Sequence, residues 1–231
     1  MEEIMVKQDL IDQSPVRIFD AAAGGALKAG QLGLITAKKG LGKTSVLVQF
    51  GIDALLYDKH LVHVSFDQHS SNVIAWYDSI LSEICKKKNI SDYTELTDSI
   101  IRDRTILNFN QESFTLPKVV NTIKSLKEGG IKVSAVIVDG LALHSVTAGD
   151  LKAVADFARQ EGIFVWFSDT NESASLAETV PEELAGFFAT VAHIAARKEG
   201  VYLTVLKADG KELDSASVRL DAKTLLMAKE K

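Results

Sequence analysis

Residues 32–44 read LGLITAKKGLGKT, and this stretch decides the fold that the sequence predicts. Its first part, Leu32 to Ile35, is a short apolar run that is typical of a buried strand. The second part, from Ala37 to Thr44, has the spacing of a phosphate-binding loop (P-loop), with alanine where the first glycine usually stands. From Thr44 to Leu56 the apolar residues recur at helical spacing, so a helix is expected to begin in the loop.

The composition of the loop suits a triphosphate. Gly40 and Gly42 let successive backbone N–H groups converge on phosphate oxygens, because no Cβ stands in the way. Lys43 can reach the β- and γ-phosphates, the Thr44 hydroxyl can bind Mg²⁺, and the start of the helix adds a positive dipole. The alternative is a lysine-rich surface turn that matches the motif by accident. We predict that ATP with Mg²⁺ binds at Lys39, Gly40, Leu41, Gly42, Lys43, Thr44 and Ser45.

Outside the loop, strand and helix patterns alternate along the chain. Apolar or β-branched runs predict strands, and helical spacing of apolar residues predicts helices between them. This alternation indicates a mainly parallel sheet with helices on both faces. After Val191 the pattern changes to short strands joined by glycine turns, which predicts an antiparallel edge. The expected strands are 61–65, 106–109, 133–138, 163–167, 191–195, 201–206 and 217–220, and the expected helices are 73–87, 116–127 and 151–160.

Length and composition indicate one globular domain over residues 1–231, with 1–15 as an N-terminal segment and 191–231 as the antiparallel strands. Hydrophobic residues make up 46% of the chain and charged residues 25%, with a formal net charge of −5. That charge gives no general attraction to nucleic acid or to an anionic membrane. The single cysteine excludes an intrachain disulfide. No apolar run is long enough to span a membrane and the first residues do not resemble a secretory signal, so we expect a cytoplasmic protein.

Two acidic residues follow expected strands. Asp139 ends the run 136–138, where it is predicted to hold the Mg²⁺ shell, although it could instead cap the following loop. Asp67 follows the strand at 61–65 and lies at the same expected sheet edge, where ligands of open α/β sheets bind. We consider Asp67 a candidate catalytic residue that orients water, with helix capping as the equal alternative.

Several motifs in this order resemble the RecA-like P-loop ATPases, and within them the group of the circadian-clock protein KaiC and RadA. The resemblance covers about residues 14–210. It implies a three-layer RecA-like core with an antiparallel C-terminal edge, ATP hydrolysis, and a homo-oligomer, often a hexameric ring, with ATP between subunits. The motifs that carry it are Gly24-Gly25, Ala29-Gly30-Gln31, the P-loop, Val64-Ser65-Phe66-Asp67 and Val136-Ile137-Val138-Asp139-Gly140-Leu141.

The sequence departs from this family at residues tied to hydrolysis. The family has glutamate where Asp67 stands, often followed by a second acid, and here Gln68 follows. Lys207 matches a lysine that reaches the neighbouring subunit's nucleotide, but Asp209 stands in the place of the accompanying arginine. By the same resemblance Asn171 is a possible γ-phosphate sensor, or else a loop cap. Slow hydrolysis is therefore predicted.

Three functions follow from these observations. The first is a slow ATPase that acts as a regulator or assembly factor. The second is a nucleotide-dependent switch that docks a protein partner with little turnover. The third, a DNA-acting recombinase or helicase paralogue, is disfavoured. In RecA-like proteins DNA lies along the loops that correspond to 140–150 and 168–196, and here neither contains lysine or arginine.

Overall fold

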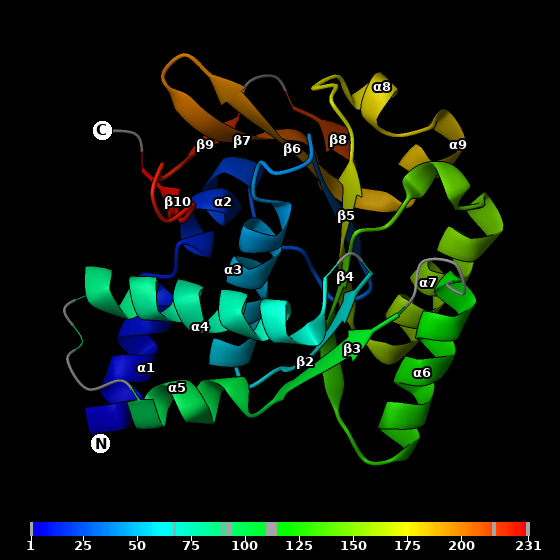
Figure 1. Cartoon of the computed structure of the whole chain (residues 1–231). Coiled ribbons are helices and arrows are strands. Elements are labelled where there is room, and N and C mark those ends of the chain that lie inside the picture. Colours follow the sequence, from blue (N-terminus) through cyan, green and yellow to red (C-terminus); the bar gives the residue numbers. More distant parts are fainter. Residues whose placement is uncertain are drawn as a thin grey trace.

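The computed structural model describes residues 2–66, 68–88, 90, 94–109, 115–213 and 216–229, and these form three layers with a sheet in the middle (Figure 1). One face of the sheet carries the first five helices and the other face carries α6 and α7. The helices are α1 (Glu2–Asp12), α2 (Val16–Ala23), α3 (Lys43–Leu56), α4 (Ser70–Lys87), α5 (Thr94–Ile101), α6 (Leu116–Glu128), α7 (Ala148–Glu161), α8 (Leu176–Thr179) and α9 (Glu182–Ala185). A 3-10 helix, η2 (Leu143–Ser145), precedes α7.

Ten strands of the described chain form one mixed sheet in the order β10-β9-β7-β6-β1-β5-β4-β2-β3, with β8 paired to β7. The six strands from β6 to β3 in this order run parallel, and the remaining pairs are antiparallel. The predicted α/β class with antiparallel edge strands is therefore confirmed. The strands are β1 (Leu32–Ala37), β2 (His60–Ser65), β3 (Arg104–Asn108), β4 (Val133–Asp139), β5 (Phe164–Thr170), β6 (Phe188–Arg197), β7 (Gly200–Ala208), β8 (Lys211–Glu212), β9 (Ser217–Leu220) and β10 (Met227–Ala228).

Strand β6 is a correction to the sequence prediction. Residues 191–195 were expected in the antiparallel edge, but β6 lies inside the sheet and pairs in parallel with β1, with Thr36 opposite His193. Only its other side pairs in an antiparallel way, with β7. The run of buried residues from Thr190 to Ile194 fits a strand that is covered on both faces. Such a run does not reveal the direction of its neighbours.

Close packing between β1, β5 and the middle of α3 holds this helix on the sheet. Trp166 of β5 is 2% exposed, and its ring stacks on Phe50 of α3 with centroids 4.4 Å apart. The ring lies over Gly33 of β1, where a Cβ would come within 2.4 Å of it. Glycine in this strand therefore serves close packing, because any side chain would push Trp166 and with it α3. The predicted strand and helix around the loop are both confirmed.

The sequence analysis missed the two helices before Leu32. Helix α2 begins after Pro15 and ends at Gly24, whose φ of 71° is the left-handed conformation common at helix ends. Phe19 is 1% exposed and meets Phe50 edge-on at 5.0 Å, so α2 packs against α3. The proline and glycine at the two ends were the available signals, and at eight residues α2 is too short for periodicity alone.

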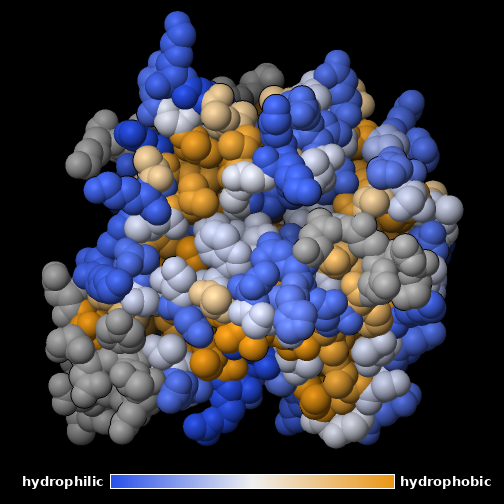
Figure 2. Space-filling model, in the orientation of Figure 1, coloured by the Kyte–Doolittle hydropathy of each residue, from blue (hydrophilic) through white to orange (hydrophobic). Residues whose placement is uncertain are grey.

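The surface seen in Figure 2 mixes hydrophilic and hydrophobic residues without one continuous apolar area. Of the large hydrophobic side chains that the structure describes, Tyr57 and Ile74 are the exposed ones. None of the helices in the described ranges combines the length and apolar character needed to cross a membrane.

Candidate functional site

The predicted P-loop connects the end of β1 to the start of α3 at the carboxyl edge of the parallel strands. Gly40 and Gly42 have φ values of 86° and 97°, so both positions require the left-handed conformation that glycine adopts without strain. A Cβ at Gly40 would meet no heavy atom of the described chain within 4 Å, and Lys38 and Lys39 beside it are exposed. The outer side of the loop is therefore open. The first backbone N–H groups of α3 have no acceptor within the helix and can serve an anion.

Thr44, in the first turn of α3, connects the loop to β4. Its hydroxyl donates a hydrogen bond to Asp139 Oδ2 at 2.7 Å. The other oxygen of Asp139 accepts from the Ser168 hydroxyl at 2.5 Å, and Ser168 Oγ in turn accepts from the backbone N–H of Gly140 at 2.9 Å. Asp139 is only 5% exposed. Two hydroxyl donors from α3 and β5 thus fix this carboxylate beside the P-loop helix.

Lys43 extends across the end of β5. Its Nζ donates to Thr170 Oγ1 at 3.0 Å and to the backbone oxygen of Ala37 at 3.3 Å. Both acceptors are the last residues of their strands, and Ala37 and Thr170 are paired in the sheet. The ammonium group therefore lies at the mouth of the loop, where it faces neutral oxygens.

A polar cluster lies on the other face of the sheet below the loop. Thr36 Oγ1 is 2.9 Å from His193 Nδ1, and Thr36 also pairs with Asp169 in the strand register. Burial raises the pKa of Asp169, whose carboxylate accepts from the backbone N–H of Leu143 at 3.2 Å. Burial, and after it the charge of Lys43, lower the pKa of His193. Both shifts favour the neutral forms of these two side chains.

Asp67, the site residue predicted after β2, lies outside the described residues. Gln68 was noted only as a departure from the family pattern, but the structure brings its side chain into the site. Its amide Nε2 donates to Thr44 Oγ1 at 3.0 Å. Ser65 Oγ donates to the backbone oxygen of Gln68 at 3.1 Å, and Asn108 Nδ2 donates to the same oxygen. The signal that could have found Gln68 is its position just past a strand of the same edge.

Three predicted residues do not face the open loop. The Ser45 hydroxyl is fully buried and has no hydrogen-bond partner among the described residues, so only its backbone N–H is available to a ligand. Asn171 Oδ1 accepts from Ser173 N at 2.8 Å, and its Nδ2 donates to Glu178 O at 3.3 Å. This arrangement is the loop cap that the sequence analysis left open.

Lys207 is also tied to its own chain. Its Nζ donates to the backbone oxygen of Ala185 at 2.7 Å, and the residue is 9% exposed. Burial lowers the pKa of Lys207. Asp209 forms an exposed ion pair with Lys28 at 3.3 Å, at a φ of 46°. Reaching a neighbouring subunit would therefore require Lys207 to leave Ala185.

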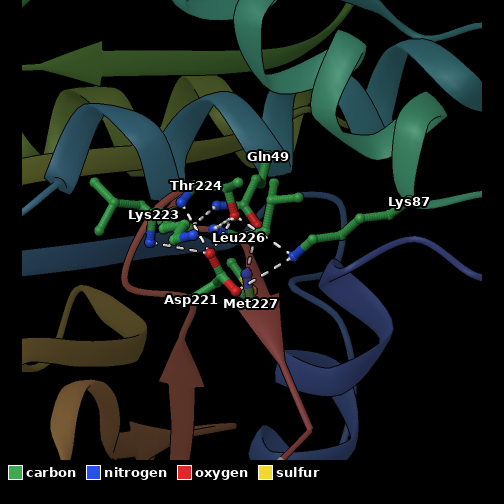
Figure 3. A network of polar contacts seen from close by, with 8 residues as sticks. Gln49, Lys87, Asp221, Lys223, Thr224, Leu226 and Met227 are labelled. Carbon is green, nitrogen blue, oxygen red and sulfur yellow. Dashed lines mark hydrogen bonds and ion pairs between the residues drawn. The ribbon is translucent and has the colours of Figure 1, made fainter.

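Residues near the C-terminus complete the surroundings of the loop, which the sequence analysis did not anticipate. A Cβ on Gly42 would lie 2.9 Å from a methyl carbon of Leu225, and Leu225 has a φ of 56°. Gln49 of α3 donates to Leu225 O at 3.0 Å and accepts from Met227 N at 2.9 Å. Asp221 Oδ1 accepts from the backbone N–H and hydroxyl of Thr224, each at 2.9 Å (Figure 3). The turn at 221–226 is thus fastened to the P-loop helix.

The donor set near Thr44 fits a metal that arrives with a phosphate ligand. The described part of the chain contains no group of three or more histidine, cysteine or acidic side chains that could hold a metal ion. Thr44 and Asp139 supply two adjacent oxygens, and Mg²⁺ is commonly bound by one or two protein groups with waters and substrate phosphates. These residues therefore fit Mg²⁺ together with a nucleotide better than Mg²⁺ alone.

Comparison with protein-family models gives no match, and comparison with curated proteins gives none either.

Proposed function

We propose that this protein binds ATP with Mg²⁺ in the P-loop and is a RecA/KaiC-like P-loop protein. The observation that carries the proposal is the 2.7 Å hydrogen bond between Thr44 and Asp139, which are 95 positions apart in the sequence. The sequence predicts Thr44 as a metal-shell residue from the loop motif, and Asp139 from its strand end together with that loop. An accidental surface turn would give no reason for them to meet.

The phosphates and the Mg²⁺ of a Mg-nucleotide have matching groups in this chain. The backbone N–H groups of residues 39–45 would hold the phosphates, and the Lys43 ammonium would neutralise part of their charge. Thr44 and Asp139 would hold the Mg²⁺, which would offset part of the negative charge of the phosphates. Lys43 would exchange Thr170 and Ala37, both neutral acceptors, for charged phosphate oxygens.

The activity that we propose is slow ATP hydrolysis in a regulator or assembly factor. Asp67 is the proposed water-orienting residue, and an aspartate there is one methylene shorter than the glutamate of the family. Lys207 is proposed to act across a subunit boundary if the protein forms a homo-oligomeric ring. A cytoplasmic location without membrane attachment is part of this proposal.

A second candidate is a nucleotide-dependent switch that docks a protein partner and turns over little ATP. The observation in its favour is the 2.7 Å bond from Lys207 to Ala185, which keeps this cation on its own subunit. Binding to DNA is not expected. The segment 168–196 contains five acidic residues and no basic one, and phosphate neutralisation supplies essentially all non-specific affinity for DNA.

Titration calorimetry with ATP tests the proposal, in Mg²⁺ and again in EDTA. Wild-type protein is expected to bind ATP in Mg²⁺. Thr44→Ala is expected to lose most of the ATP affinity that depends on Mg²⁺. Lys38→Ala is the matched control, because Lys38 is an exposed loop lysine that pairs with Glu172 at 3.5 Å. Absence of binding to the wild type at millimolar Mg-ATP would refute the proposal. Phosphate release that is lost in Asp67→Asn and kept in Asp67→Glu would select the ATPase over the switch.

A further inference from the structure

The Thr44 hydroxyl has two partners in this structure, and together they engage its proton and one of its two lone pairs. A hydroxyl has one proton to donate and two lone pairs to accept with. The proton of Thr44 is directed at Asp139 Oδ2 at 2.7 Å, and one lone pair accepts from Gln68 Nε2 at 3.0 Å. Because Asp139 takes the proton, only the N–H end of the Gln68 amide can face Thr44.

The main chain of Gln68 is fixed and its side chain is the part that can move. Its backbone oxygen accepts from Ser65 Oγ and Asn108 Nδ2, and its backbone N–H donates to Ser65 Oγ at 3.3 Å. These bonds attach it to the ends of β2 and β3. The side chain is partly exposed and can leave Thr44 by rotating about its own bonds.

We propose that Gln68 competes with the divalent cation for the Thr44 oxygen and so sets how much Mg²⁺ the site requires. Without metal, the Gln68 amide satisfies the Thr44 lone pair. A cation on the second lone pair of Thr44 would lie close to the positively polarised N–H of Gln68, so the amide has to turn away for the cation to bind well. Gln68 is thus a positioning residue that opposes metal binding, and this role rests on the Mg-nucleotide function proposed above.

The expected size of the effect follows from the kind of bond that is lost. A neutral intramolecular hydrogen bond contributes roughly 1 kcal/mol net, which corresponds to about a five-fold change in an equilibrium constant. Removing the Gln68 amide should therefore lower the half-saturating Mg²⁺ concentration about five-fold at a fixed, saturating concentration of ATP. A carboxylate in its place cannot donate to Thr44 and adds a negative charge beside Asp139, so Gln68→Glu should lower that concentration further.

The experiment is a Mg²⁺ titration followed by the melting temperature of the protein in ATP, with wild type, Gln68→Ala and Gln68→Glu. Asn72→Ala is the matched control, because Asn72 is an exposed amide in the first turn of α4. We expect the control to follow the wild type, and ATP affinity in EDTA to be equal in the wild type, Gln68→Ala and Asn72→Ala. If Gln68→Ala does not fold, Gln68→Met keeps the side-chain length without the donor.

Three outcomes are decisive. A five-fold lower Mg²⁺ requirement in Gln68→Ala, with the control unchanged, supports the competition. An unchanged or higher Mg²⁺ requirement in Gln68→Ala overturns the competition while leaving the proposed nucleotide function in place. A wild type that responds to no combination of Mg²⁺ and ATP refutes both.

Discussion

Helix α3 has a polar cluster at each end, and the two clusters are built in opposite ways. At the N-terminal end, Thr44 bonds to Asp139 beside a loop that is open at Gly40. At the C-terminal end, Asp53 pairs with Arg17 of α2, and Arg17 also pairs with Asp20 at 2.8 Å. These ion pairs line a hollow of about 220 Å³ beside Trp166 and Phe164.

The different construction of the two clusters indicates a different role for each. At the N-terminal end the helix dipole and the free N–H groups favour an anion, and the nearby protein groups leave room for one. At the C-terminal end a cation pairs with two acids within the protein, and these ion pairs join α2 to α3. The first cluster is therefore suited to a ligand and the second to holding helices together. Substitutions at the two ends should separate binding from stability.

Arg17→Ala should have the largest effect on stability. It leaves Asp20 and Asp53, whose side chains are each 13% exposed, without their shared cation. Removing one partner of such a cluster is expected to lower the free energy of unfolding by about 3 kcal/mol, measured by urea denaturation. Lys152→Ala, which removes an exposed ion pair with Asp156, is the control and should cost less than about 1 kcal/mol. Equal losses of unfolding free energy in the two variants would show that the Arg17 ion pairs do not stabilise the packing of α2 on α3.

The next largest expected effect is the change in unfolding free energy with pH that Asp20 causes. Burial raises its pKa to about 6, although Arg17 opposes the shift. The folded state then holds a proton that the unfolded state releases near pH 4, so this group's contribution to stability is lost as pH rises from about 4 to about 6. Relative to Asp20→Asn, wild-type protein should lose about 2 kcal/mol of unfolding free energy over this range. Parallel stability curves for the two proteins would contradict the prediction.

Asp139→Asn should have the smallest effect on stability, although it lies at the proposed nucleotide-binding end of α3. Asparagine keeps the size of Asp139 and can still accept one hydroxyl, while it removes a buried charge, so the two changes offset each other. We expect the free energy of unfolding to stay within about 1 kcal/mol of the wild type and the Mg²⁺ dependence of ATP binding to disappear. A stability loss as large as that of Arg17→Ala would mean that Asp139 is mainly structural.

Much of the site could be predicted because its central residues lie in local patterns. The P-loop between β1 and α3, and the β-branched run that ends in Asp139, each predict a strand end and a polar group from a few adjacent residues. The strand order β1-β5-β4 and the packing of α3 on the sheet then bring Thr44 and Asp139 together.

The residues that were missed depend on how distant segments meet. Ser168 reaches Asp139 because β5 pairs with β4, and Leu225 reaches Gly42 because the chain returns to α3 after β9. The parallel pairing of β6 with β1 is of the same kind, since a strand's own residues do not reveal its partner. Gln68 was seen as a departure from the family pattern, but its contact with Thr44 depends on the path of the chain after β2.

The central claim is that the N-terminal end of α3 binds Mg-ATP, and a thermal unfolding scan with and without the nucleotide tests it most directly. At a ligand concentration about one hundred times the dissociation constant, binding should stabilise the wild type by about 2.7 kcal/mol. We predict that this shift is lost in Lys43→Ala and fully kept in Arg17→Ala, although the latter starts from a lower melting temperature. A wild type that shows no shift at millimolar Mg-ATP, or a Lys43→Ala variant that keeps the full shift, would contradict the account.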